Sequence, residues 1–178
     1  MRPLAIVGNG STRTNAPHAD LTFDVWGMNN HPYLWQKRVT ALFEMHPDAL
    51  FTDRYTDDYK AWLRQRHEFP IYMHQVHPDI PNSVQFPRED IAHYRGGLLQ
   101  KGDTIIQDFY TETTPYMLAL ALHMGYQHIE LYGIDMNKDY QHYRDGVFFW
   151  LGILHAHNVE IILPENTPLL SETLYPFF

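Results

Sequence analysis

The feature that most constrains the fold of this chain is an apolar run, Leu4–Val7, that ends in a turn of small residues, Gly8–Ser11. A short apolar run bounded by glycines is typical of a buried strand. Two more segments, Val25–Asn30 and Leu131–Asp135, also end in polar residues. Because ligands bind beyond the carboxyl ends of the strands in an open α/β sheet, these three ends predict a shared ligand crevice.

Strand-like and helix-like segments alternate along the chain. We expect strands at 3–7, 23–27, 39–45, 70–73, 129–134 and 159–163, and helices at 31–38, 57–63, 113–124 and 146–157. The segment 74–87 holds three prolines and is expected to be a loop, while 88–110 has no clear pattern. Strands separated by helices predict an α/β fold in three layers, a Rossmann-like domain whose mostly parallel sheet has helices on both faces. A length of 178 residues favours one domain over 1–178, and a glycine turn after the first strand usually positions a nucleotide. We therefore expect a single Rossmann-like nucleotide-binding domain.

The segment 113–124 is the clearest predicted helix. Thr113 or Thr114 can cap it, Pro115 suits its first turn, and Gly125 ends it. Its residues are apolar on most sides, so we expect this helix to be buried.

Composition excludes several classes of site. The chain has no cysteine, which rules out disulfides, zinc–thiolate sites and cysteine nucleophiles. His74, His77 and Asp79 lie close together in sequence, but their spacing is not that of a zinc site, and we expect no metal. A net charge of −8 argues against a broad nucleic-acid surface, although a small phosphate pocket of backbone amides is compatible with it.

No segment approaches the roughly 20 apolar residues of a membrane span. The first residues also lack the basic and apolar pattern of a signal peptide. We therefore expect a cytoplasmic protein. An apolar segment near residue 178, which includes Leu174, Tyr175, Phe177 and Phe178, indicates either a subunit contact or packing within the chain. Of these two, we favour a homo-oligomer.

Several short motifs, in order along the chain, resemble the bacterial sialyltransferases of glycosyltransferase family 42. These motifs are Ile6–Ser11, Phe23–Asn29, Thr113–Ala121, Gly125–Tyr126 and Leu131–Asp135. They are also similar to the wider Rossmann-like group that includes archaeal 6-hydroxymethylpterin diphosphokinase-like proteins. Small phage-encoded proteins look like nearer relatives, through the motifs Phe43–His46, Ile80–Val84 and Tyr132–Met136.

The resemblance implies that a nucleotide or nucleotide-sugar is bound as substrate, without a further cofactor. The nucleotide-binding residues that it implies are Gly8, Asn9, Gly10, Ser11, Asn29, Thr113, Thr114 and Asp135. In the family, the first turn holds phosphates and ribose, and an asparagine contacts the donor. A Thr-Ser pair before the central helix helps to bind the nucleotide.

The family also places a lid after the Gly-Ile-Asp motif. Tyrosines there stabilise the departing phosphate, and the resemblance implies this role for Tyr140 and Tyr143. A lid histidine is the general base in the family, and His142 is the candidate for that role. The lid is short in this chain, because the helix expected at 146–157 follows closely on Asp135.

Two groups of residues suggest a chemical role independently of the family resemblance. Glu44 and His46 are two apart at the end of an expected strand, so they share a face and suit proton transfer. The alternative is a hydrogen-bonded histidine that only ends the strand. Arg144 follows the two tyrosines and can hold a phosphate through two parallel hydrogen bonds, unless the segment is an exposed polar loop.

These observations leave three hypotheses for function. The first is a metal-independent, glycosyltransferase-like enzyme, and the second is another nucleotide-processing enzyme such as a phosphotransferase or hydrolase. The third is a non-catalytic module that captures a nucleotide, and any of the three could be phage-encoded. The pair of Glu44 and His46 favours an enzyme, whereas the short lid favours the second and third hypotheses.

Overall fold

A seven-stranded parallel sheet organises the computed structural model, which describes residues 1–29, 34, 36–51, 53–96, 99–106, 109–136 and 142–170. The strand order is β5-β4-β3-β2-β1-β8-β9. Their bounds are β1 Leu4–Val7, β2 Asp24–Met28, β3 Ala41–Phe43, β4 Ile71–Met73, β5 Ser83–Gln85, β8 His128–Tyr132 and β9 Glu160–Ile162. The chain builds outward from β1 to β5 and then returns to the other side of β1, so the topological switch point lies between β1 and β8.

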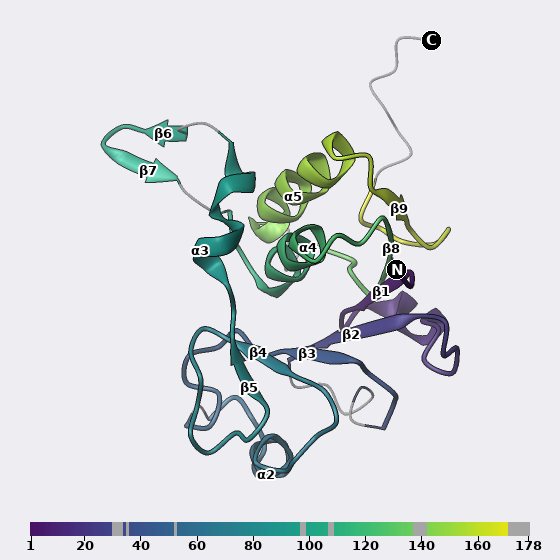
Figure 1. Ribbon diagram of the computed structural model, residues 1–178, viewed down its shortest axis with the longest axis vertical. Helices are drawn as coiled ribbons and strands as arrows, with labels where there is room; N and C mark the ends of the chain where they lie inside the picture. The colour runs from purple at the N-terminus through teal and green to yellow at the C-terminus, as the bar shows by residue number, and fades with distance from the viewer. Residues whose placement is uncertain are drawn as a thin grey trace.

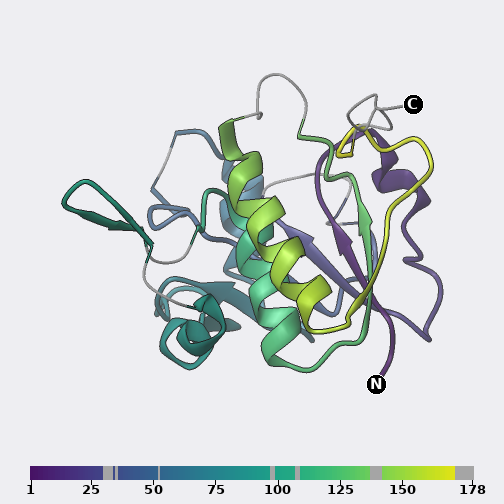
Figure 2. The same cartoon turned by 90° about the horizontal axis from the view of Figure 1, so that it is seen from above.

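Helices flank this sheet. Their bounds are η1 Ser11–Asn15, α2 Asp57–Leu63, α3 Arg88–Ile91, η2 Ala92–Arg95, α4 Thr113–His123 and α5 Arg144–Ala156. α4 and α5 pack side by side, and α2 lies at the opposite side of the sheet (Figure 1). Figure 2 shows the strand arrows of β1 and β8 pointing toward the side on which α5 begins. The predicted three-layer Rossmann-like α/β fold is confirmed.

Alternation along the strands explains why both faces of the sheet are covered. Leu4 and Ile6 of β1 pack in the cluster that contains α4 and α5, whereas Ala5 and Val7 pack in a cluster on the other face. Leu42 of β3 likewise packs with α2 residues, because successive side chains on a strand point to opposite faces. The strands therefore appear in the sequence as continuous apolar runs rather than as alternating ones.

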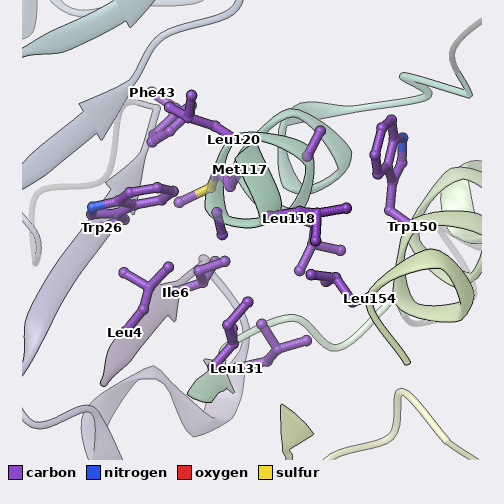
Figure 3. Close-up of a cluster of buried hydrophobic side chains, with 14 of the residues drawn as sticks. Leu4, Ile6, Trp26, Phe43, Met117, Leu118, Leu120, Leu131, Trp150 and Leu154 are labelled. Atoms are coloured by element: carbon purple, nitrogen blue, oxygen red, sulfur yellow. The ribbon is translucent and has the colours of Figure 1, made fainter. Parts of the chain in front are cut away.

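The larger cluster joins the sheet to α4. Figure 3 shows Leu4, Ile6 and Leu131 of the strands facing Met117 and Leu118 of α4. All five are almost completely buried. Each buried leucine or methionine contributes about 1.5–3 kcal/mol by leaving water. This burial fixes the N-terminal end of α4 beside the carboxyl ends of the strands.

Two expectations about local structure need correction, and one segment without a clear pattern contains regular elements. The segment 74–87 was expected to be a loop, but it contains β5, whose side chains are largely exposed and give no apolar run. The segment 88–110 contains α3, η2 and a separate antiparallel hairpin of β6 (Leu99–Lys101) and β7 (Thr104–Ile106). The strand expected at 39–45 is only three residues long.

Other expectations fall on residues that the structure does not describe. They include most of the helix expected at 31–38 and the apolar segment 171–178 on which the homo-oligomer prediction depends. Within the described ranges, no helix is long and apolar enough to cross a membrane.

Candidate functional site

A cavity of about 680 Å³ lies where the carboxyl ends of the strands meet the start of α4. Residues after five strands line it: Asn9 and Gly10 after β1, Asn29 after β2, His46 after β3, His74 after β4 and Gly133–Met136 after β8. Glu112, Thr113 and Thr114 close it from the start of α4. The three strand ends that were predicted to share a crevice therefore do so.

The turn after β1 is tied tightly to the turn after β8. The Gly8 and Gly10 amides donate to the carbonyls of Tyr132 and Gly133, each at 2.8 Å. The Ser11 amide and hydroxyl both donate to Oδ2 of Asp135, at 2.6 and 2.9 Å. The amides of Gly8, Gly10 and Ser11 thus already have acceptors within the protein, and a phosphate cradle made by this turn stays a prediction.

Asn9 and Gly10 are the residues of that turn that reach the cavity. A Cβ at Gly10 would overlap the carboxyl group of Asp135, so a glycine is required for this approach. Oδ1 of Asp135 is buried, faces no hydrogen-bond donor among the described residues, and belongs to a side chain that lines the cavity.

Asn29 is held in place from two sides. Its backbone has a φ of 52°, a conformation that asparagine tolerates better than most residues. Its amide donates to the Phe43 carbonyl at 2.9 Å. Its side-chain Oδ1 accepts from the Thr113 hydroxyl at 3.2 Å, which leaves the Asn29 side-chain NH₂ to donate to a ligand.

Glu44 and His46 form the most extensive polar network at the site. Nδ1 of His46 lies 2.7 Å from Oε1 of Glu44, and the backbone amide of His46 donates to the same oxygen at 3.2 Å. The Tyr59 hydroxyl donates to Oε2 of Glu44 at 2.6 Å, and the Tyr55 hydroxyl donates to Oε1 at 3.1 Å. Glu44 is fully buried, so these donors replace the water that it has lost.

This network shifts three pKa values. The hydrogen bond to Glu44 raises the pKa of His46, and burial opposes that rise. Burial is the main cause that raises the pKa of Tyr55 and of Tyr59, and the negative charge of Glu44 adds to it. Both tyrosines therefore stay protonated and act as donors. Nδ1 of His46 is engaged both by Glu44 and by the Tyr55 hydroxyl, which lies 2.6 Å from it, so Nε2 is the ring nitrogen left for a ligand.

Two basic side chains lie near His46 in the same cavity wall. Arg54 and His74 both line the cavity. Burial lowers the pKa of His74, and the nearby charges of Arg88 and His46 lower it further. Among the residues that the structure describes, no group of three or more histidine and acidic side chains could hold a metal ion.

Comparison with known proteins gives a likeness in fold. No family model matches the chain, and neither does any curated protein. The structure is similar to the sialyltransferase CstII from Campylobacter jejuni bound to cytidine 5′-monophosphate (CMP). That match has a TM-score of 0.57 and 19% identity, and covers 95% of this chain and 82% of that chain.

Two further CstII structures match in the same way. The complex with CMP-3FNeuAc gives a TM-score of 0.55 at 19% identity, over 92% of this chain and 80% of CstII. The complex with a trisaccharide acceptor and CMP gives 0.54 at 16% identity, over 91% of this chain and 80% of CstII. At such identities the likeness shows the glycosyltransferase-like fold. The similarity to phage proteins stays a prediction.

The segment predicted to stabilise a departing phosphate is only partly at the site. Tyr143 lines the cavity, and its carbonyl accepts from the Thr111 hydroxyl at 2.6 Å. Arg144 is absent from the cavity lining, because its guanidinium donates to the Leu169 carbonyl at 2.6 Å and lies over the Phe148 ring. His142 is exposed and is also not among the lining residues. Tyr140 lies outside the described residues.

Sequence reasoning missed Tyr55, Tyr59 and Glu112. Tyr55 directly precedes the N-cap of α2, Thr56, and Tyr59 lies in the first turn of that helix. Nothing in the sequence links these two tyrosines to Glu44. Glu112 directly precedes α4. It was not singled out because the two threonines that follow it are the more usual capping residues.

Proposed function

We propose that this chain is a glycosyltransferase-like enzyme that binds a nucleotide-activated sugar in the cavity. The observation that carries the proposal is the imidazole of His46, fixed by a buried carboxylate at a strand end that opens into the cavity. A passive binding module has no need of a histidine that is oriented and made more basic in this way. The fold shared with CstII, which was solved with CMP and a CMP-sugar analogue, supports a nucleotide donor.

The proposed reaction uses His46 as general base. The acceptor hydroxyl attacks the anomeric carbon of the donor sugar while Nε2 of His46 takes its proton. A bond forms between the acceptor oxygen and that carbon, and the bond from the carbon to the phosphate oxygen breaks. The electron pair leaves with the nucleotide phosphate, and the donor needs no redox partner.

Glu44 acts through His46 in this proposal. Its carboxylate holds the Nδ1–H tautomer, so that Nε2 carries the free electron pair. It also stabilises the imidazolium that forms during proton transfer. Tyr59 and Tyr55 keep the carboxylate in place and complete its hydrogen bonds.

The departing phosphate needs donors or positive charge. The side-chain NH₂ of Asn29, the Tyr143 hydroxyl and Arg54 are on residues that line the same cavity and can supply both. Arg144 is not assigned this role, since its guanidinium binds the Leu169 carbonyl.

A second candidate is a hydrolase that acts on a similar nucleotide. The short connection between Asp135 and the start of α5 at Arg144 favours it, because a short lid excludes less water. In that case His46 would activate water in place of a sugar hydroxyl.

Calorimetry and turnover assays test the proposal. Purified protein should bind CMP, and it should convert a CMP-activated sugar either to a glycoside, when a sugar acceptor is present, or to free sugar and CMP. The ratio of these products separates transferase from hydrolase. Absence of binding to every nucleoside monophosphate and to CMP-sugars would overturn the proposal.

A further inference from the structure

Glu112 occupies an unusual place for an acidic side chain, directly before the N-terminal end of α4 and in the cavity wall. Its Oε1 atom is buried and makes no hydrogen bond within the described part of the chain. The Thr113 and Thr114 amides and the Thr114 hydroxyl lie close enough to lower the pKa of the carboxyl group, although no side-chain capping hydrogen bond forms at the start of the helix.

Asp135 presents a second acceptor of the same kind. Its Oδ2 is used by Ser11, but its Oδ1 is buried without a donor. Both carboxyl groups line the same cavity. A buried acceptor without a partner costs about 1–3 kcal/mol, and such atoms are rare in folded proteins. Two of them in one cavity indicate a ligand that brings its own donors.

A phosphate does not fit this part of the cavity. The N-terminal end of a helix ordinarily attracts an anion, but the carboxyl group of Glu112 already lies there. A phosphate at the same place would lie beside Glu112 and Asp135, and like charges repel.

A cation fits poorly for the opposite reason. The start of α4 carries the positive end of the helix dipole, which disfavours a second positive group. The described residues also form no group of three or more side chains suited to a metal ion. Neutral hydroxyl groups satisfy both carboxyl groups without either penalty.

The opposite wall of the cavity has the complementary chemistry. His46, Arg54 and His74 lie there, after β3 and β4. This wall suits an anionic group, and it contains the proposed general base. Because the phosphate of an activated sugar separates the transferred sugar from the nucleoside, a sugar that reacts near His46 leaves the ribose on the far side.

We propose that Glu112, together with Asp135, binds the hydroxyl groups of the ligand's ribose, while the phosphate lies toward His46, Arg54 and His74. This inference rests on the proposed nucleotide-binding function and names the part of the ligand that each wall recognises. The start of α4 then selects for ribose instead of binding phosphate. Burial raises the pKa of Glu112, and the nearby Thr113 and Thr114 donors only partly oppose that rise.

Ligands that differ by one hydroxyl test the assignment. Binding of CMP, 2′-deoxy-CMP and 3′-deoxy-CMP would be measured by calorimetry for the wild type, Glu112→Leu and Glu112→Gln. Loss of a hydrogen bond to a charged group corresponds to roughly a tenfold to hundredfold change in affinity. We expect the wild type to lose this much with at least one deoxy ligand. Glu112→Leu should lose the discrimination against the deoxy ligand that lacks the hydroxyl bound by Glu112, while any discrimination that Asp135 makes remains. Glu112→Gln should fall between Glu112→Leu and the wild type.

Glu165→Gln is the matched control, because Glu165 is exposed and is not among the residues that line the cavity. It should discriminate as the wild type does. Equal discrimination by wild type and Glu112→Leu would overturn the role of Glu112 while leaving nucleotide binding intact. The same holds if the wild type does not distinguish the three ligands. Failure of the wild type to bind CMP, AMP, GMP or UMP would remove the proposed function as well.

Discussion

The carboxyl groups in the two walls of the cavity differ in whether their oxygens have hydrogen-bond donors. On the β3 side, both oxygens of Glu44 have donors, and its neighbours hold His46 in one orientation. On the side of β1, β8 and α4, Glu112 and Asp135 each keep a buried oxygen without a donor. A carboxylate whose hydrogen bonds are complete positions another group, whereas one with an unused oxygen is suited to bind a ligand.

The difference separates positioning from recognition. The network around Glu44 is complete before any ligand arrives, so little reorganisation accompanies proton transfer at His46. The opposite wall gains its missing hydrogen bonds only from a ligand, so part of the binding free energy offsets a cost already present in the free protein. Substitutions on the two walls should therefore affect turnover and binding differently.

The largest effect is expected from His46→Asn. Removal of a general base lowers the rate by typically 10²–10⁴-fold, so kcat for a CMP-sugar should fall by about this factor. Affinity for CMP should fall far less than kcat, because Arg54 and His74 remain in the cavity wall that faces the phosphate. His142→Asn is the control, since His142 is exposed and away from the cavity lining. If His142→Asn removed activity and His46→Asn did not, the general base would be His142 and the assignment of His46 would be wrong.

The next largest effect concerns Tyr59→Phe. This change leaves Oε2 of the buried Glu44 without its donor at 2.6 Å, and an unsatisfied buried acceptor costs about 1–3 kcal/mol. Urea unfolding should show a loss of stability in this range. Tyr126→Phe is a matched control, because the Tyr126 hydroxyl donates to Asp24, which is only partly buried. A loss at Tyr126 equal to that at Tyr59 would contradict the importance of Glu44 burial.

The two walls also differ in how far the sequence predicts them. The spacing of Glu44 and His46 on one strand fixes their common face, because alternation along a strand is a local property. The partners Tyr55 and Tyr59 come from α2 and the residues just before it, which only the packed fold brings to Glu44. Local pattern therefore predicts the pair, and tertiary packing supplies the rest of the network.

The opposite wall was predicted less accurately for the same physical reason. The glycine turn after β1 was identified, but which amides remain available depends on β8, which is far away in sequence. Arg144 was predicted as a phosphate ligand from its place after the two tyrosines, and the sequence does not indicate that its guanidinium contacts Leu169 and Phe148. β5 was missed because its side chains are largely exposed.

The pH dependence of turnover would sharpen the contrast further. The hydrogen bond to Glu44 raises the pKa of His46 above 6.5, so kcat/KM should rise with pH through an apparent pKa above 6.5. Glu44→Gln should move this rise in kcat/KM to lower pH, because a neutral amide stabilises the imidazolium form of His46 less than a carboxylate does. Protonated His46 also stabilises the fold, and that contribution is fully present below pH 6.5 and lost as pH rises through the pKa in the folded state. An unshifted rise in kcat/KM for Glu44→Gln would show that the carboxylate does not set the basicity of His46.

The smallest effect is expected from Glu112→Gln without ligand. Burial raises the pKa of Glu112 above its ordinary value of 4.5, so the folded protein holds a proton that the unfolded chain has released. The free energy of unfolding therefore falls as pH rises from the pKa of Glu112 in the unfolded chain to its higher pKa in the folded protein. At neutral pH the folded protein bears the full cost of a buried, ionised Glu112. Glutamine removes the cost, so Tm at pH 7 should rise, and the gain should disappear below the pKa of the unfolded chain. A change of 1 kcal/mol moves Tm by roughly 2–4 °C at this chain length, and we expect an increase of at most this size.

Glu44→Gln provides the opposite result for comparison, because it weakens a carboxylate whose hydrogen bonds are complete. Thermal unfolding of both variants at pH 4 and pH 7, with and without CMP, separates the two walls. If Glu112 is a recognition residue, Glu112→Gln should be more stable than the wild type alone and should gain less stability from CMP. A variant that loses stability without ligand would instead make Glu112 part of the structural support of α4. The unused oxygen at the start of that helix would then be no sign of a ligand.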